Sequence, residues 1–245
     1  MSRLQYVYSK RFIALGYLLI IAIGTLLLAL PLSNKSSSPL PFIDVLFTAT
    51  SATCVTGLTI ADTYSQFTYF GQAVLLILIQ VGGLGFMSLA IFFLMLSGSK
   101  ITLKERSLLS ESLNVSKLGG ILRVVQKAAL LTLFCELVGA ALLSLHFIPE
   151  YGPRRGVWFA LFHAISAFCN AGFDLMGAKH PFSSLNTFSQ DPLVLLTIAL
   201  LIITGGLGFI VYQDLFEKKF RFQAFELHTK VVLSMSALLI IGATI

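Results

Sequence analysis

Two stretches of this chain decide its fold: DVLFTATSATCVTGL at residues 44–58 and FALFHAISAFCNAGF at residues 159–173. Aligned position by position, they are identical at seven of fifteen places. The identical pairs are Leu46/Leu161, Phe47/Phe162, Ala49/Ala164, Ser51/Ser166, Ala52/Ala167, Cys54/Cys169 and Gly57/Gly172. The pentapeptide GGLGF follows each stretch, at residues 82–86 and again at 205–209. Two motifs repeated in the same order predict two copies of one structural unit.

The composition predicts that these units lie in a membrane. Only 11% of the 245 residues are charged and 56% are hydrophobic, whereas a soluble domain has about 25% charged residues. The mean hydropathy is +0.88, so there is too little charge to cover a water-soluble surface. We therefore predict an all-α integral membrane protein with the lipid bilayer around most of the chain. The net charge is +6, but the basic residues stand in short stretches between apolar runs, which argues against nucleic-acid binding.

Apolar runs divide the chain into helix–pore loop–helix (M1-P-M2) units. The first unit, residues 1–97, has helices at about 12–32 and 67–96 around a pore loop at about 42–60. A cytoplasmic linker at 98–123 precedes the second unit, residues 124–212, with helices at about 124–148 and 192–212 around a pore loop at about 158–173. A second cytoplasmic linker, 213–230, leads to an apolar run at 231–245. Because a span needs about 20 apolar residues, we expect that run to be the truncated start of a third unit.

The distribution of basic residues predicts the orientation. With a cytoplasmic N-terminus, thirteen of the 17 Lys and Arg residues fall on the cytoplasmic side. The four that fall outside are Lys35, Arg154, Arg155 and Lys179. Cytoplasmic loops carry the excess of Lys and Arg, so we expect a multi-pass protein of the plasma membrane with both pore loops on the outer side.

The two pore loops indicate a path for a cation. Each loop is too rich in Thr, Ser, Cys and Gly for a lipid-facing helix, and exposed backbone persists at membrane depth only inside protein or along a wet cavity. Rings of backbone carbonyls can replace the hydration shell of a cation, and glycine reaches the dihedrals that such a segment needs. Short helices at about 44–53 and 159–168 would direct their partial negative C-terminal charge at the ion. We predict that a cation is held by backbone carbonyls alone, in a selectivity filter made of Val55, Thr56, Gly57, Asn170, Ala171 and Gly172.

The alternative for these glycines is close helix packing, which small residues support in many membrane proteins. We favour packing for GGLGF, because the motif falls inside an expected spanning helix. We favour the pore interpretation for Gly57 and Gly172, because each ends a segment that is too polar for lipid.

Four ionisable residues are further candidates. Glu136 falls inside the expected span 124–148, where an ionisable group is costly, and it has either a structural or a functional role, the structural one being favoured. His163 in the second short helix is expected to be a hydrogen-bonded core residue rather than a ligand. Asp62 and Asp174 follow the two loops, where they either concentrate cations or simply face solvent.

Catalytic motifs are missing from the sequence. We find no HExxH, GxSxG or P-loop motif, no paired carboxylates and no metal-ligand spacing of His and Cys, so we expect no enzyme and no covalently bound cofactor. Transport would follow the ion gradient and the membrane potential. Two competing interpretations are a truncated, non-conducting half that only scaffolds or docks a regulatory subunit and, more weakly, an intramembrane enzyme.

The quoted motifs resemble a known family. TSATCVTGLTIADT (50–63), LLILIQVGGLGFMSLA (75–90) and FHAISAFCNAGFDLMG (162–177) resemble the KtrB/TrkH/HKT superfamily of potassium transporters, and most closely its KtrB (NtpJ-like) branch. The resemblance covers essentially the whole chain and implies four units around one pore with pseudo-fourfold symmetry, of which this chain holds the N-terminal half.

The resemblance also implies partners and selectivity. It implies a homodimer and a cytoplasmic nucleotide-binding ring of the KtrA/TrkA type, so that any nucleotide acts only through that partner. At the position that matches Gly57, glycine goes with potassium selectivity and serine with sodium preference in the family, so Gly57 points to potassium. Sodium coupling stays open, and so does conduction by two loops alone, because two loops cannot surround an ion.

Overall fold

The computed structural model describes residues 3–35, 40–85, 121–219 and 221–244, and every regular element in these ranges is a helix. The α-helices are α1 (Arg3–Ala29), α2 (Phe42–Thr53), α3 (Thr63–Gln66), α4 (Tyr69–Leu84), α7 (Ile121–Tyr151), α8 (Pro153–Phe168), α9 (Pro192–Gly206), α10 (Phe209–Glu217) and α11 (Leu227–Thr244). Short 3-10 helices are η1 (Pro31–Ser33), η2 (Met176–Ala178), η3 (Ser184–Phe188) and η4 (Phe222–Ala224). The all-α class predicted from the sequence is confirmed for this part of the chain.

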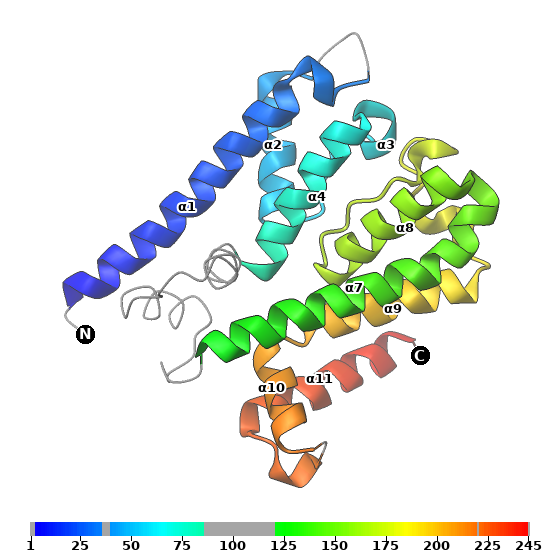
Figure 1. Ribbon diagram of the computed structural model, residues 1–245. Coiled ribbons are helices and arrows are strands. Elements are labelled where there is room, and N and C mark those ends of the chain that lie inside the picture. Colours follow the sequence, from blue (N-terminus) through cyan, green and yellow to red (C-terminus); the bar gives the residue numbers. More distant parts are fainter. Residues whose placement is uncertain (1–2, 36–39, 86–120, 220, 245) are drawn as a thin grey trace.

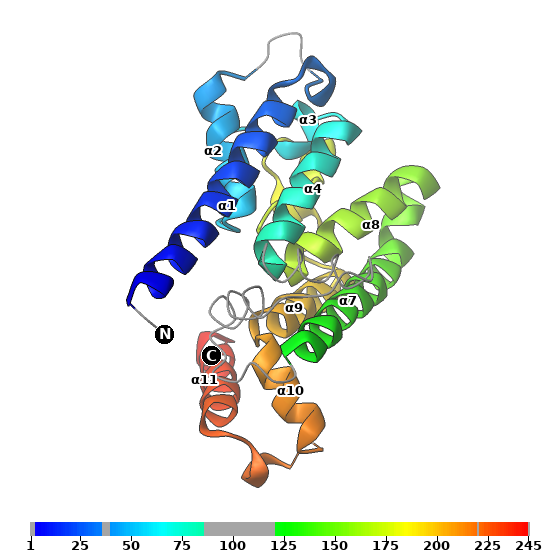
Figure 2. The same cartoon turned by 60° about the vertical axis from the view of Figure 1, so that its left-hand side comes forward.

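The helices form two groups with the same internal contacts. In the first group α1 packs against α2 and α4, and α2 packs against α4; in the second, α7 packs against α8 and α9, and α8 packs against α9. The first group meets the second through α4 and α8. Figures 1 and 2 show α4 between α1 and the second group. In Figure 1, α10 and α11 lie below α7 and α9.

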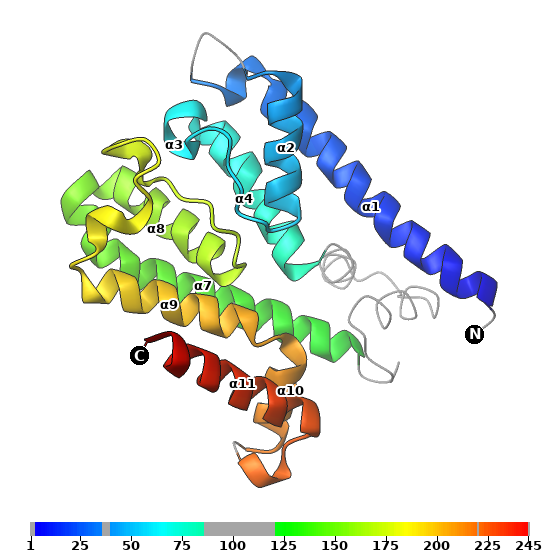
Figure 3. The same cartoon turned by 180° about the vertical axis from the view of Figure 1, so that it is seen from behind.

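The short helices α2 and α8 are followed by chain that turns back. Figure 3 shows the segment after each of them running along its helix toward the end where that helix begins. The two returning segments then meet, because α3 contacts η2. Both short helices start earlier than expected, at Phe42 and Pro153. Pro41 is the N-cap of α2, and Pro153 lies in the first turn of α8, where no backbone N–H is required.

The prediction of a single helix at 192–212 is wrong. The chain is helical to Gly206 and again from Phe209, and the two helices are bent by 87°. The break falls on Gly208, whose φ of +84° is a left-handed conformation that glycine adopts readily. The first GGLGF also ends a helix, since α4 stops at Leu84 and Gly85 has a φ of +75°. The placement of GGLGF inside spanning helices is therefore corrected: in both copies the motif ends a helix.

Among the described helices, only some of the expected spans are long enough to cross a membrane. Residues 125–151 of α7 are long and apolar enough to cross a membrane, and α9 with α10 would add a second span if the bent pair counts as one. The apolar parts of α1, α4 and α11 are shorter. The part of the expected helix at 67–96 beyond residue 85, and residues 98–120 of the expected linker, lie outside the described residues.

Large apolar side chains lie on the outer faces of these helices. On α1 they are Leu15, Leu18, Leu19, Ile23 and Leu26, and on α7 they are Leu130, Leu133, Phe134, Leu137 and Val138. A water-soluble surface rarely carries such contiguous patches, whereas lipid or further protein would cover them at no cost. The core itself is aromatic, with Phe147, Phe159 and Phe162 fully buried.

Candidate functional site

The helices α2 and α8 end in the same way. Their last residues are Thr53 and Phe168, and Cys54 and Cys169 follow as C-caps. The next residues, Val55 and Asn170, have left-handed φ values of +57° and +56°.

Matching hydrogen bonds hold both ends. The N–H of Val55 donates to Ala52 O (3.4 Å) and that of Thr56 donates to Ser51 O (3.0 Å). In the second group Asn170 donates to Ala167 O (3.0 Å) and Ala171 donates to Ser166 O (2.8 Å). This pair of bonds is the Schellman motif that closes a helix with a left-handed residue. The same motif at equivalent positions of both stretches matches the repeat seen in the sequence.

Beyond this motif, the two loops meet at their glycines. We call residues 54–57 and 169–172 the paired loops. Gly57 has a φ of +74° and Gly172 a φ of +72°, so each loop has two left-handed residues separated by one residue. A Cβ at Gly172 would lie 3.2 Å from Gly57 Cα, and a Cβ at Gly57 would lie 2.9 Å from Ala171 O. The paired loops therefore touch backbone to backbone, and a side chain at either glycine would press on the other loop.

The valine in the first loop is strained, and the asparagine in the second is not. A left-handed conformation costs most L-residues about 1–2 kcal/mol, and a β-branched residue rarely takes it, whereas asparagine tolerates it. Asn170 Nδ2 also donates to the carbonyls of Phe168 and Ile202, at 3.3 Å each.

Exchanging these two residue types should change stability in opposite directions. We expect Asn170→Val to lower the free energy of unfolding by about 2 kcal/mol, through strain and lost hydrogen bonds. Val55→Asn should raise it by about 1 kcal/mol, because the same conformation is relieved. Thermal unfolding of the two purified variants measures both. Changes of the same sign would show that backbone conformation does not distinguish the two positions.

The first glycine of each GGLGF packs on the end of its own short helix. A Cβ at Gly82 would overlap Thr53 O, and a Cβ at Gly205 would overlap Phe168 O. Thr53 and Phe168 are the last residues of α2 and α8. Helices α4 and α9 can thus approach the paired loops only because these two residues lack side chains. Close packing is the role that sequence analysis favoured for the motif.

The two loops are not equivalent in exposure. Cys54 and Thr56 are exposed and Val55 and Gly57 are partly exposed, whereas Ala171 is fully buried beside exposed Asn170 and Gly172. The equivalent serines, Ser51 and Ser166, make different side-chain hydrogen bonds. Thr56 Oγ1 donates to Ser51 Oγ (2.9 Å), while Ser166 Oγ donates to the carbonyl of Phe173 (2.6 Å).

His163 is a hydrogen-bonded core residue, as expected. It is 3% exposed, and its Nε2 accepts from the N–H of Leu175 at 3.2 Å. Nδ1 therefore carries the proton and donates to Phe159 O at 2.7 Å. The imidazole fixes the chain just after the second loop and has no ring nitrogen left for a ligand.

Asp62 takes neither of its two expected roles. The residue is 7% exposed, and its carboxylate accepts from Ser65 N (2.7 Å) in α3 and from Phe182 N (3.0 Å) in the second group. It is therefore an N-cap that also joins the two returning segments, which sequence reasoning missed. Asp174 is partly buried and accepts from the N–H of Met176 (2.8 Å).

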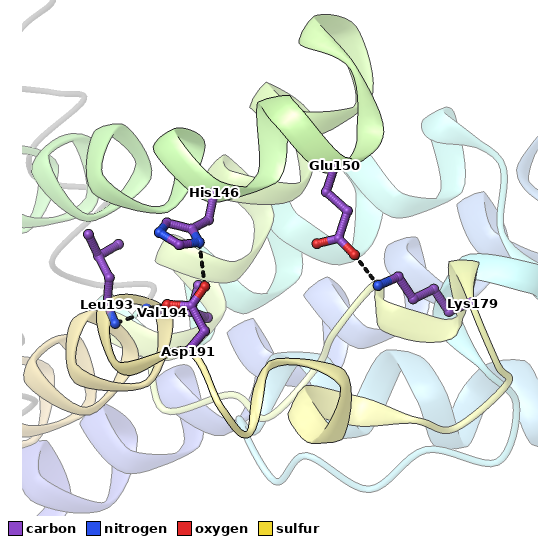
Figure 4. Close-up of polar contacts among 6 residues, drawn as sticks. All are labelled: His146, Glu150, Lys179, Asp191, Leu193 and Val194. Atoms are coloured by element: carbon purple, nitrogen blue, oxygen red, sulfur yellow. Dashed lines mark hydrogen bonds and ion pairs between the residues drawn. The ribbon is translucent and has the colours of Figure 1, made fainter.

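Two ion pairs fix the chain between the second loop and α9 (Figure 4). His146 and Glu150 of α7 pair with Asp191 and Lys179, respectively. Asp191 is also the N-cap of α9 and accepts from the N–H groups of Leu193 and Val194. Burial lowers the pKa of Lys35, which follows η1, and nearby Arg155 in α8 lowers it further.

Glu136 lies in α7 and is 4% exposed. It does not belong to the paired loops.

The electrostatics of the paired loops favour a cation. Both short helices end immediately before the loops, so two helix C-termini with partial negative charge lie at one place. The described residues contain no group of three or more His, Cys, Asp or Glu side chains that could hold a metal. The partial negative charge at the loops comes from the two helix ends.

Turned-back loops behind short helices, in an apolar all-helical chain, are a feature of many membrane transport proteins. Residues 10–245 match the TrkH family, described as cation transport proteins. The chain belongs to this family, and with its composition this places it in a membrane.

Named relatives agree with this assignment. The chain is 47% identical over 227 residues to the Ktr system potassium uptake protein B of Bacillus subtilis, covering 93% of this chain and 49% of that protein. It is 42% identical over 233 residues to the potassium/sodium uptake protein NtpJ of Enterococcus hirae, covering 95% and 50%. It is 40% identical over 240 residues to the Ktr system potassium uptake protein B of Vibrio alginolyticus, covering 97% and 51%. The chain spans about half the length of the curated relatives it matches.

Proposed function

We propose that this chain takes part in potassium uptake and that the ion passes along the paired loops. The observation that carries the proposal is their geometry: two helices end in the same left-handed motif, and their glycines meet. Carbonyls of residues 55–57 and 170–172 would replace the water of the ion. The names of the three relatives, two potassium uptake proteins and one potassium/sodium uptake protein, support potassium as the cargo.

Each helix group would then be one M1-P-M2 unit. In the first group α1, α2 and α4 take the three parts, and in the second α7, α8 and α9 take them. Four such units would surround one pore with pseudo-fourfold symmetry, so further units are required beyond the two described here. The bias of Lys and Arg supports a multi-pass topology with a cytoplasmic N-terminus.

The driving force would be the membrane potential, worth about 2.3 kcal/mol per 100 mV for one charge. Uptake should also be measured with and without sodium, because the name of the Enterococcus relative includes sodium. The word system in the name of two relatives favours further components. We propose a homodimer and a cytoplasmic nucleotide-binding ring of the KtrA/TrkA type as those components.

A second candidate is a non-conducting half that only scaffolds or docks a regulatory subunit. The number of loops favours it for the chain on its own, since two loops cannot surround an ion.

Rubidium uptake separates the two candidates. The chain is expressed in cells that lack potassium transport, alone and together with the second half of the Bacillus subtilis relative. We expect uptake in the combined case. Uptake by the chain alone would mean that its copies complete the pore, and no uptake in either case, with both proteins present in the membrane, would refute conduction.

A further inference from the structure

Two buried oxygens on one face of α7 lack a partner among the residues that the structure describes. Thr132 Oγ1 and Glu136 Oε1 make no hydrogen bond in this part of the chain, and these residues are only 1% and 4% exposed. They are four residues apart, so their side chains are neighbours on the helix surface. Buried polar atoms are nearly always satisfied, so two adjacent exceptions indicate a missing partner.

The surroundings of Glu136 supply more polar groups. The side chain of Gln80, from α4, hydrogen-bonds to the Glu136 carboxyl group. Gln80 Oε1 is 3.9 Å from Cys169 Sγ, which can donate to it, so the amide reaches Glu136 through its Nε2 donor. This cluster of Thr132, Glu136 and Gln80 joins the two helix groups just behind the second loop, at Cys169.

Within the described ranges, no ion pair brings a positive charge to this cluster, since neither of the two pairs includes Glu136. A carboxylate buried at membrane depth requires a counter-charge or a proton. The cluster has one carboxylate, beside a neutral hydroxyl and a neutral amide, so its single negative charge would balance one monovalent cation. Sites for divalent cations commonly use several carboxylates.

We propose that Thr132, Glu136 and Gln80 form a binding site for a monovalent cation, separate from the paired loops. The carboxylate supplies the charge, and Thr132 Oγ1 supplies a second oxygen. The site would stabilise the junction between α4 and α7 when occupied. It does not depend on the proposed conduction, since it uses none of the loop residues.

Thermal unfolding of the purified chain in detergent tests the site. Trp158, the single tryptophan, gives the fluorescence signal. NaCl replaces N-methylglucamine chloride at constant ionic strength, because potassium would also be expected at the loops. We expect Tm to rise by about 5 °C at a concentration near 100 times Kd.

Three variants locate the ion. Glu136→Gln keeps the shape of the side chain and should lose the rise in Tm, and Thr132→Val should reduce it. Thr229→Val is the matched control, because Thr229 Oγ1 is also buried without a partner, but on α11; it should keep the full rise.

A rise in Tm that persists in Glu136→Gln would overturn the proposal. So would the absence of any sodium effect on the unsubstituted chain at pH 8, since the carboxyl would then hold a proton. If Glu136→Gln does not fold, Thr132→Val decides: an undiminished rise refutes the site. Because the readout is unfolding, the result stands whether or not the chain conducts.

Discussion

Gly57→Ser is expected to lower rubidium uptake at least about tenfold, or to shift the preference toward sodium, in whichever assembly conducts. The added Cβ would lie 2.9 Å from the Ala171 carbonyl oxygen, on a backbone with φ of +74°. Strain at such a residue costs about 1–2 kcal/mol, and the second loop must also move. About 1.4 kcal/mol corresponds to a factor of ten in rate, so the two effects together reach or exceed that factor.

Uptake of rubidium and of sodium is compared in the same cells. Gly242→Ser is the matched control, because no atom lies within 4 Å of a Cβ at Gly242, and it should leave uptake unchanged. If Gly57→Ser transports rubidium at the normal rate with the normal preference, the paired loops are not the ion path.

Gly205→Ala is expected to destabilise the chain by about 3 kcal/mol or more, lowering Tm by about 6 °C or more. The added methyl group would overlap the carbonyl oxygen of Phe168, a backbone atom at the end of α8 that cannot rotate away. Helix α9 must therefore move away from α8 or lose its regular form.

The neighbouring glycine provides the control in the same motif. A Cβ at Gly206 would have only Asn170 Nδ2 nearby, at 3.8 Å, so Gly206→Ala should change Tm by no more than about 2 °C. Equal losses of Tm in both variants would show that close packing at Phe168 is not what the first glycine provides.

The ends of the short helices could be predicted from the sequence, but the conformations beyond them could not. The repeat and the small polar residues marked where α2 and α8 stop, at Thr53 and Phe168. Nothing local indicates that Val55, a β-branched residue, is left-handed. That conformation is imposed by the Schellman bonds and by packing, with Val55 Cγ2 only 2.9 Å from where a Cβ at Gly82 would lie.

Contacts between distant segments explain the other differences. Asp62 resembles a solvated loop residue because its acceptor role depends on Phe182, 120 residues further along the chain. GGLGF was predicted to continue a helix because its flanks are apolar. The helix ends there because the last glycine of each copy, Gly85 or Gly208, is left-handed.

The bend after α9 has a consequence for the thickness of the barrier to an ion. A helix of 15 residues is about 22 Å long, whereas the hydrocarbon core of a bilayer is about 30 Å thick. Helix α10 bends away from α9 by 87°, so it adds little to the depth covered. If α9 is perpendicular to the membrane plane, roughly a quarter of the hydrocarbon core lies beyond its end. Along the proposed ion path, α9 would therefore line only part of the depth that the neighbouring α7 is long enough to cross.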